Sequence, residues 1–170
     1  MYYWDVKVGS TFKTLHLSHD QICQFASNCV LHALDVNRPY LEKELGTSTY
    51  ERLKDEVEVA KEQQSARLDG VEFVLSLRPA MDSELSLIHE VNESIFAACF
   101  LFELLQKHEH RLAMDVADTS YQSVTRREVD EALQCTNKRT FNEKEVFKVE
   151  ESLAVCQREV NLQLQLLKVN

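Results

Sequence analysis

The chain has 170 residues, of which 44% are hydrophobic and 28% are charged, and this is the composition of a globular domain rather than a disordered or fibrous chain. Three glycines and two prolines are too few to make the turns of a β-sandwich or barrel, so we do not expect an all-β fold. The net charge of −9 disfavours binding to nucleic acid or to an anionic membrane surface.

The cysteines and the N-terminus indicate a cytoplasmic protein. The five cysteines are an odd number without CxxC spacing, and they lie in apolar helical patterns, so we expect reduced core residues. The N-terminus lacks the basic start and the apolar run of a signal peptide. The longest uncharged apolar run, residues 94–102, is too short to cross a membrane.

The first part of the chain predicts an arm followed by helices. Residues 1–17 are either strand-like or simply an arm laid over the core. Ser18 and Gln21 have capping-box spacing, and apolar residues follow at helical intervals, so a long amphipathic helix begins here. Pro39 suits the first turn of a short helix that ends at Gly46.

A second capping box, Ser48 with Glu51, predicts the start of the next helix, which carries a narrow apolar stripe. The Asp69-Gly70 pair is expected to end that helix. One or two further helical turns should follow before Pro79, since a strand there would have no partner elsewhere in the chain.

The most apolar helix is predicted over about residues 84–107, with Asp82 and Ser83 as its N-terminal cap. Its middle is hydrophobic on nearly every face. Such a helix must be surrounded by other elements, so we expect it to be the centre of the fold.

Two more helices complete the prediction, one from about 110 to 133 and one that begins at the capping box formed by Asn142 and Glu145. The last helix carries an apolar seam interrupted by Gln163, which indicates antiparallel packing or a homodimer contact. The sequence therefore predicts one all-α domain over residues 1–170, an antiparallel bundle of about six helices around the central apolar helix.

The sequence contains no established pattern for catalysis. Phosphate-binding loops, GxSxG, HExxH and the Glu-x-x-His pairs of di-iron bundles are all absent. The pairs that share a helical face are His19 with Cys23 and His89 with Glu93. His108 and His110 should point away from each other and be solvated. We expect a protein that is not an enzyme and has no metal or cofactor, and a metal- or thiol-dependent enzyme is the weaker alternative.

Acidic residues are concentrated in the middle of the chain. Residues 69–103 contain seven acidic residues and one arginine, which gives −6 of the net charge of −9. One interpretation is a solvated face, and the sharper one is a negative patch that docks a basic protein. The candidate binding residues are Asp69, Glu72, Asp82, Glu84 and Glu90.

Several core and cap positions carry a family resemblance. They are Leu17-x-x-x-Gln21-x-x-x-Phe25, Asp82-x-Glu84-Leu85 leading into Val91, Glu93 and Ala97, and Ala113-x-x-Val116-Ala117 followed by Ser120 and Val124. Through these positions, residues 17–124 resemble the YjaG-like family of small bacterial proteins, a domain of unknown function. The resemblance implies an all-helical cytoplasmic protein, and it supplies no active site to transfer.

Three functional hypotheses follow. The small size, the acidity and the lack of catalytic motifs resemble the immunity proteins that bacteria pair with secreted toxins, so the first is neutralisation of a basic toxin domain, such as a nuclease, by binding and covering it. The second is a housekeeping YjaG-like homo-oligomer that dimerises through the last helix. The third is the metal or thiol enzyme.

Overall fold

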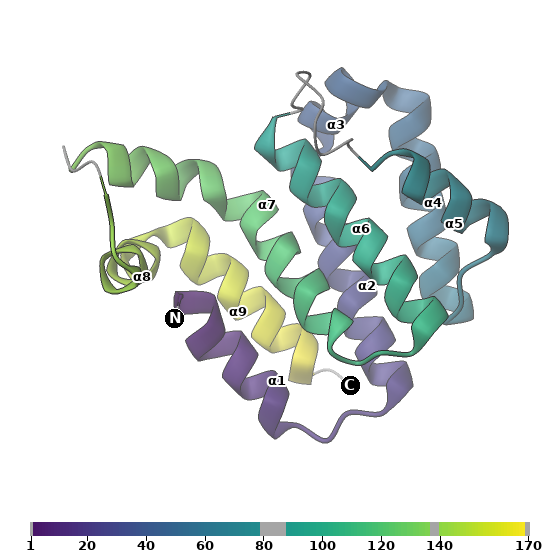
Figure 1. The fold of residues 1–170 in the computed structure, drawn as a ribbon, viewed down its shortest axis with the longest axis horizontal. Helices are drawn as coiled ribbons and strands as arrows, with labels where there is room; N and C mark the ends of the chain where they lie inside the picture. The colour runs from purple at the N-terminus through teal and green to yellow at the C-terminus, as the bar shows by residue number, and fades with distance from the viewer. Residues whose placement is uncertain (1, 79–87, 137–139, 169–170) are drawn as a thin grey trace.

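The computed structural model describes residues 2–78, 88–136 and 140–168, and these contain helices and no strand (Figure 1). The all-α prediction is therefore confirmed. In chain order the elements are the π-helical segment η1 (Asp5–Gly9), α1 (Ser10–Thr14), α2 (His19–Val36), α3 (Arg38–Leu45), α4 (Thr47–Gln63), α5 (Leu68–Ser76), α6 (His89–Lys107), α7 (Leu112–Gln134), α8 (Glu143–Ser152) and α9 (Ala154–Lys168).

Capping boxes start two of the helices, as predicted. At α2, the Ser18 hydroxyl accepts a hydrogen bond from the Gln21 amide at 3.3 Å, and the Gln21 side chain accepts one from the Ser18 amide at 2.9 Å. Asn142 and Glu145 make the same reciprocal pair at α8. Each box satisfies two backbone N–H groups that a helix start otherwise leaves without partners.

Two boundaries around α4 differ from the prediction. No side chain caps α4, because Gly46 takes a left-handed φ of 85° and the helix starts directly after it, which places Ser48 inside the first turn. The helix ends where Gln64 adopts a φ of 51°, before the expected end at Asp69-Gly70. That pair lies inside the separate helix α5.

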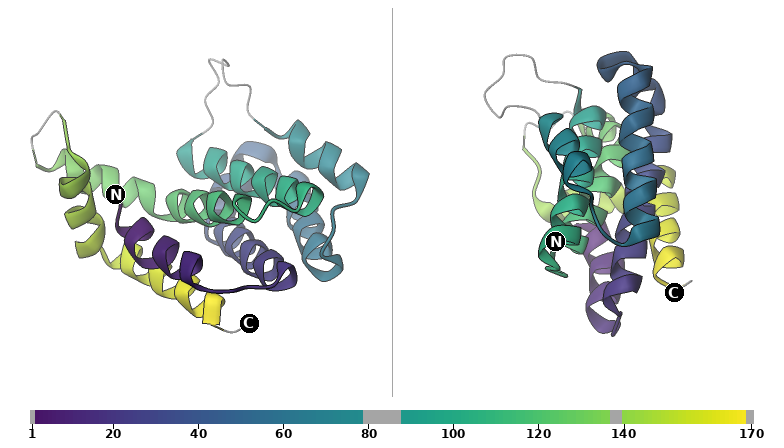
Figure 2. Two further views of the ribbon diagram at one scale, coloured as in Figure 1. Left: turned by 60° about the horizontal axis from the view of Figure 1, so that its bottom comes forward. Right: turned by 90° about the vertical axis from the view of Figure 1, so that its right-hand side faces the viewer.

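The N-terminal residues are helical, so the strand-like alternative for residues 1–17 is wrong. η1 and α1 run along α9, as the purple and yellow ribbons show in Figure 2. Tyr3, Trp4 and Val8 are buried and belong to the same apolar cluster as α9. Burial of these large side chains is the physical reason that the arm is fixed on the core.

The predicted last helix is two helices. Leu153 adopts an extended backbone, with φ −83° and ψ 128°, and separates α8 from α9. This break, the helical N-terminus and the separate α5 account for nine α-helices in the described residues where about six were expected.

The buried side chains form two clusters that share α2 and α7. In the first cluster, α6 packs with α4, α5 and the start of α7, and it contributes side chains such as Ile95 and Phe102. The second cluster joins α9 and the N-terminal residues to Phe25 on α2 and Tyr121 on α7. The expected cap of α6, Asp82 with Ser83, lies outside the described residues. Within the parts of the chain that are described, no helix has both the length and the apolar character needed to span a bilayer.

Candidate protein-binding surface

The five candidate acidic residues fall into three groups, which are exposed, buried, and outside the described residues. Asp69 and Glu72 are exposed on α5, one helical turn apart. Glu90 lies in the first turn of α6 and is buried, with 7% of its surface exposed. Asp82 and Glu84 lie outside the described residues. The structure thus groups the two residues on α5 and directs Glu90 toward α7.

Glu90 is part of a contact that joins three helices. Its Oε1 forms an ion pair with the Arg127 guanidinium on α7, at a distance of 2.5 Å. Arg127 also lies over the ring of Tyr40 on α3, 4.6 Å from the ring centroid, and donates a hydrogen bond to the Tyr40 hydroxyl. Because this carboxylate is paired and covered, we assign it a structural role in holding α3, α6 and α7 together.

The outer face of α5 combines exposed leucines with carboxylates. Leu68 is 78% exposed and Leu75 is 39% exposed, and they lie at helical positions i and i+7 with Glu72 between them. The opposite side of the helix, which includes Val71 and Val74, is buried in the first cluster. We call the strip formed by Leu68, Asp69, Glu72 and Leu75 the α5 strip.

An ion pair below the α5 strip holds the start of the helix. Arg67 donates to both carboxylate oxygens of the buried Glu56 on α4, at 2.9 and 3.1 Å. Its contact with Asp69 is longer, 3.7 Å, and the Asp69 side chain is 69% exposed. A long, exposed pair of this kind contributes little to stability, so the Asp69 carboxylate is available to a partner.

Gly70 lets α5 approach α4 closely. A Cβ atom at this position would lie 2.5 Å from Glu56 Oε2 and 3.5 Å from a ring carbon of Phe102. Gly70, which the sequence suggested as a helix end, is therefore a position inside α5 where the backbone packs closely against Glu56 and Phe102.

Three histidines meet at the start of α2. His108 Nδ1 lies 2.9 Å from His19 Nε2, and the His110 ring stacks on the His19 ring with centroids 5.6 Å apart. His19 also contacts Cys23 Sγ at 3.4 Å, as their shared helical face indicated. His108 and His110 are exposed, as expected, but they do not point apart. They converge on His19, because the turn between α6 and α7 lies against the start of α2.

This histidine cluster does not favour metal or thiolate chemistry. No group of three or more metal-ligating side chains in the described part of the chain has a geometry that could hold an ion. Burial raises the pKa of the Cys23 thiol to about 11, and the pKa values of Cys99 and Cys156 also to about 11, so the thiolate is disfavoured at these positions at neutral pH. The pKa of His19 is lowered, first by burial and then by His108 and His110.

The leucines of the α5 strip are the functional candidates that the sequence reasoning missed. The sequence reasoning rested on the excess of carboxylates over residues 69–103, which selects Asp69 and Glu72 and gives no reason to select the leucines. The available signal is the i, i+4, i+7 spacing of Leu68, Glu72 and Leu75, which places them on one face opposite the buried valines.

Comparison with known proteins gives no match to a family model, to a curated protein or to a solved structure.

Proposed function

We propose that the protein is a non-enzymatic acidic binding domain that docks a basic protein through the α5 strip. The observation that carries this proposal is Leu68, which is 78% exposed beside two exposed carboxylates, Asp69 and Glu72. Exposed apolar side chains grouped on one face mark interaction surfaces, and the surrounding charge selects a partner of opposite sign.

The carboxylates and the leucines of the α5 strip have different roles in the proposed contact. The net charge of −9 attracts a basic partner over a distance, and the carboxylates of the α5 strip orient it at contact. Leu68 and Leu75 can then be buried by the partner, which slows dissociation. A nuclease toxin fits this chemistry, because it carries a basic cleft for phosphates and loses activity when that cleft is covered. The specific function proposed is that of an immunity protein.

The test uses the C-terminal domain encoded by the neighbouring upstream reading frame. We expect this domain to be toxic when expressed alone and to be neutralised by co-expression with the protein. Binding kinetics of the purified pair should show an association rate that falls as NaCl is raised. D69K/E72K should lower the association rate about tenfold, and L68A/L75A should mainly raise the dissociation rate.

A matched control separates local contact from overall charge. E131K/E151K raises the net charge by the same amount at exposed positions on α7 and α8, at the end of the molecule opposite α5 (Figure 1). It should keep the association rate within about threefold of the unmodified protein. A neighbouring domain that is not toxic or not bound, or equal effects of the two charge reversals, would contradict the proposal.

The alternative, a YjaG-like homo-oligomer that dimerises through its last helix, has less support. The seam residues Cys156, Val160 and Leu167 are already buried within one chain, where α9 packs against α2, α7 and η1. We therefore expect the sedimentation coefficient to be that of a monomer at all concentrations. A dimer that forms as concentration rises would favour the homo-oligomer.

A further inference from the structure

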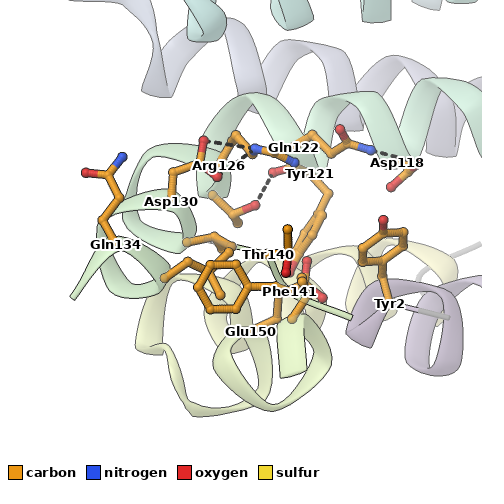
Figure 3. Close-up of a pocket in the computed structure, with 14 residues that line it drawn as sticks. Tyr2, Asp118, Tyr121, Gln122, Arg126, Asp130, Gln134, Thr140, Phe141 and Glu150 are labelled. Carbon is orange, nitrogen blue, oxygen red and sulfur yellow. Dashed lines mark hydrogen bonds and ion pairs between the residues drawn. The ribbon is translucent and has the colours of Figure 1, made fainter. Parts of the chain in front are cut away.

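A cavity of about 520 Å³ lies between α7, from Asp118 onward, and α8, with Tyr2 at one end (Figure 3). Its volume is in the range of small-molecule binding sites. Val129, Leu133, Phe141 and Val146 give it an apolar side. The cavity is separate from the α5 strip and takes no part in the function proposed above.

The polar side of the cavity is acidic. Asp118 accepts a hydrogen bond of 3.0 Å from the Gln122 amide, and Glu150 accepts one of 2.9 Å from the backbone amide of Tyr3. Arg126 is the basic residue among the described residues that line the cavity, and its guanidinium is bound to Asp130 at 3.0 Å. The hydrogen-bond donors to Asp118 and Glu150 are neutral, and Arg126 is the guanidinium in the lining that also acts on Glu150. The described lining thus carries three carboxylates, those of Asp118, Asp130 and Glu150, against one guanidinium in a partly buried space.

A buried hydroxyl in the same cavity is also left without a partner. Tyr121 is 2% exposed and lines the cavity, and its hydroxyl has no hydrogen bond of ordinary geometry, although Cys156 and Thr125 lie near it. In Figure 3 its side chain reaches from α7 toward α8. A buried polar atom without a partner is costly, and a bound donor or acceptor would relieve that cost.

We propose that this cavity is a binding site for a small organic cation, a primary amine with an aromatic or aliphatic body. The ammonium group donates to the carboxylates of Asp118 and Glu150 and to the oxygen of Tyr121. The body lies against the apolar side formed by residues such as Val129 and Phe141. Anionic ligands are excluded, because the two carboxylates would repel them.

The experiment is isothermal titration calorimetry of the full chain at pH 7.5 with phenethylammonium and with hexylammonium. At least one of the two amines should bind, whereas phenylacetate and 2-phenylethanol, which keep the aromatic body but lack the positive charge, should not. Asp118→Asn and Glu150→Gln should each weaken binding about tenfold or more. Glu151→Gln changes the exposed neighbouring carboxylate on α8 and should leave the affinity unchanged.

A second variant keeps the proposal testable if Asp118→Asn or Glu150→Gln does not fold. Tyr121→Phe keeps the ring and should retain the helical circular-dichroism spectrum while weakening binding several-fold. The proposal is overturned if neither amine binds, if 2-phenylethanol binds as well as phenethylammonium, or if Glu151→Gln weakens binding as much as Asp118→Asn. Tighter binding of a lysine-containing peptide than of either amine would assign the cavity to a protein side chain and would also overturn it.

Discussion

The indole nitrogen of Trp4 donates a hydrogen bond of 2.7 Å to Oε1 of Gln163, although the two residues are separated by 159 positions in the sequence. The Gln163 amide nitrogen donates in turn to the Ala117 carbonyl at 3.1 Å and to Glu159 at 3.2 Å. The polar residue that interrupts the apolar seam of α9 is therefore fully buried and joins the N-terminus, α7 and α9. Each of its side-chain atoms that can form a hydrogen bond is used.

Gln163→Leu should destabilise the protein by about 1–3 kcal/mol, because it leaves the buried Trp4 indole without its acceptor and removes the bond to the Ala117 carbonyl. Urea unfolding followed by the fluorescence of Trp4, the single tryptophan, measures the free energy of unfolding. Gln165→Leu makes the same substitution at an exposed position two residues later and should change it by less than about 0.5 kcal/mol. Equal effects of the two substitutions would show that the hydrogen bonds of Gln163 contribute nothing specific.

His32 should make stability depend on pH. Its Nε2 lies 2.8 Å from the buried Glu159 carboxylate, and this hydrogen bond is the largest cause of its raised pKa. Because the folded state holds the proton more tightly, the stabilisation is complete below the ordinary pKa of about 6.5 and is lost as the pH rises through the raised pKa.

The measurement is the melting temperature of the unmodified protein and of His32→Gln between pH 5.5 and 8.5. The advantage of the unmodified protein should be largest at pH 5.5 and should shrink toward pH 8.5. His16→Gln, at an exposed position, serves as the control and should follow the unmodified protein throughout. An advantage that grows with pH would contradict a charged His32 paired with Glu159.

Asp118 should also lower stability as the pH rises, but over a more acidic range than His32, because burial disfavours its charged form. Burial raises its pKa from 3.8 to about 6, more than the Gln122 hydrogen bond lowers it. Between pH 4 and 6 the folded state then binds more protons than the unfolded state, so this group lowers the free energy of unfolding as the pH rises. Asp118→Asn should stabilise the protein at pH 7.5 by about 1–3 kcal/mol.

Urea unfolding at pH 4.0 and at pH 7.5 tests this prediction. The gain from Asp118→Asn should be small at pH 4.0 and near its maximum at pH 7.5. Asp20→Asn, which removes an exposed carboxylate, should give no such pH-dependent gain. A gain that is the same at both pH values would show that desolvation of the Asp118 carboxylate is not its cause.

Substitution of Glu90 should lower the free energy of unfolding more than substitution of Asp69, a difference that the sequence alone does not indicate. Glu90→Gln leaves half-exposed Arg127 without its buried ion partner and should cost about 1–3 kcal/mol. Asp69→Asn removes only a long, exposed contact with Arg67 and should cost less than about 0.5 kcal/mol. Chemical denaturation of the two variants in parallel gives both values. If Asp69→Asn proved the more damaging change, the assignment of structural and surface roles would be reversed.

Local signals in the sequence predicted the helix starts well where a residue at the start itself favours the helix, as a capping side chain or a first-turn proline does. Ser18 and Asn142 form their capping boxes as expected, and Pro39 lies in the first turn of α3. The same spacing at Ser48 failed, because the conformational freedom of Gly46 lets α4 begin two residues earlier than the box requires. The break at Leu153 between α8 and α9 could not be predicted in this way, because no glycine or proline lies at this position.

The candidate sites depend on contacts between distant segments, which periodicity does not specify. Nothing near Glu90 in the sequence indicates that Arg127 will cover it, and nothing near His19 indicates that His108 will approach it. The leucines of the α5 strip have the composition of a core segment, and only the placement of α5 at the surface makes them candidates for binding.

The pairing of Trp4 with Gln163 also constrains how the chain matures during synthesis. The first apolar cluster needs no residue beyond Val116, so its members are all available while the later part is still being translated. The second cluster lacks α9 until residues 154–168 have been translated, and until then Phe25 and Tyr121 have no cover from that helix. A ribosome stalled before α9 would therefore display an apolar surface of the kind that chaperones recognise, and the docking of α9 would cover it.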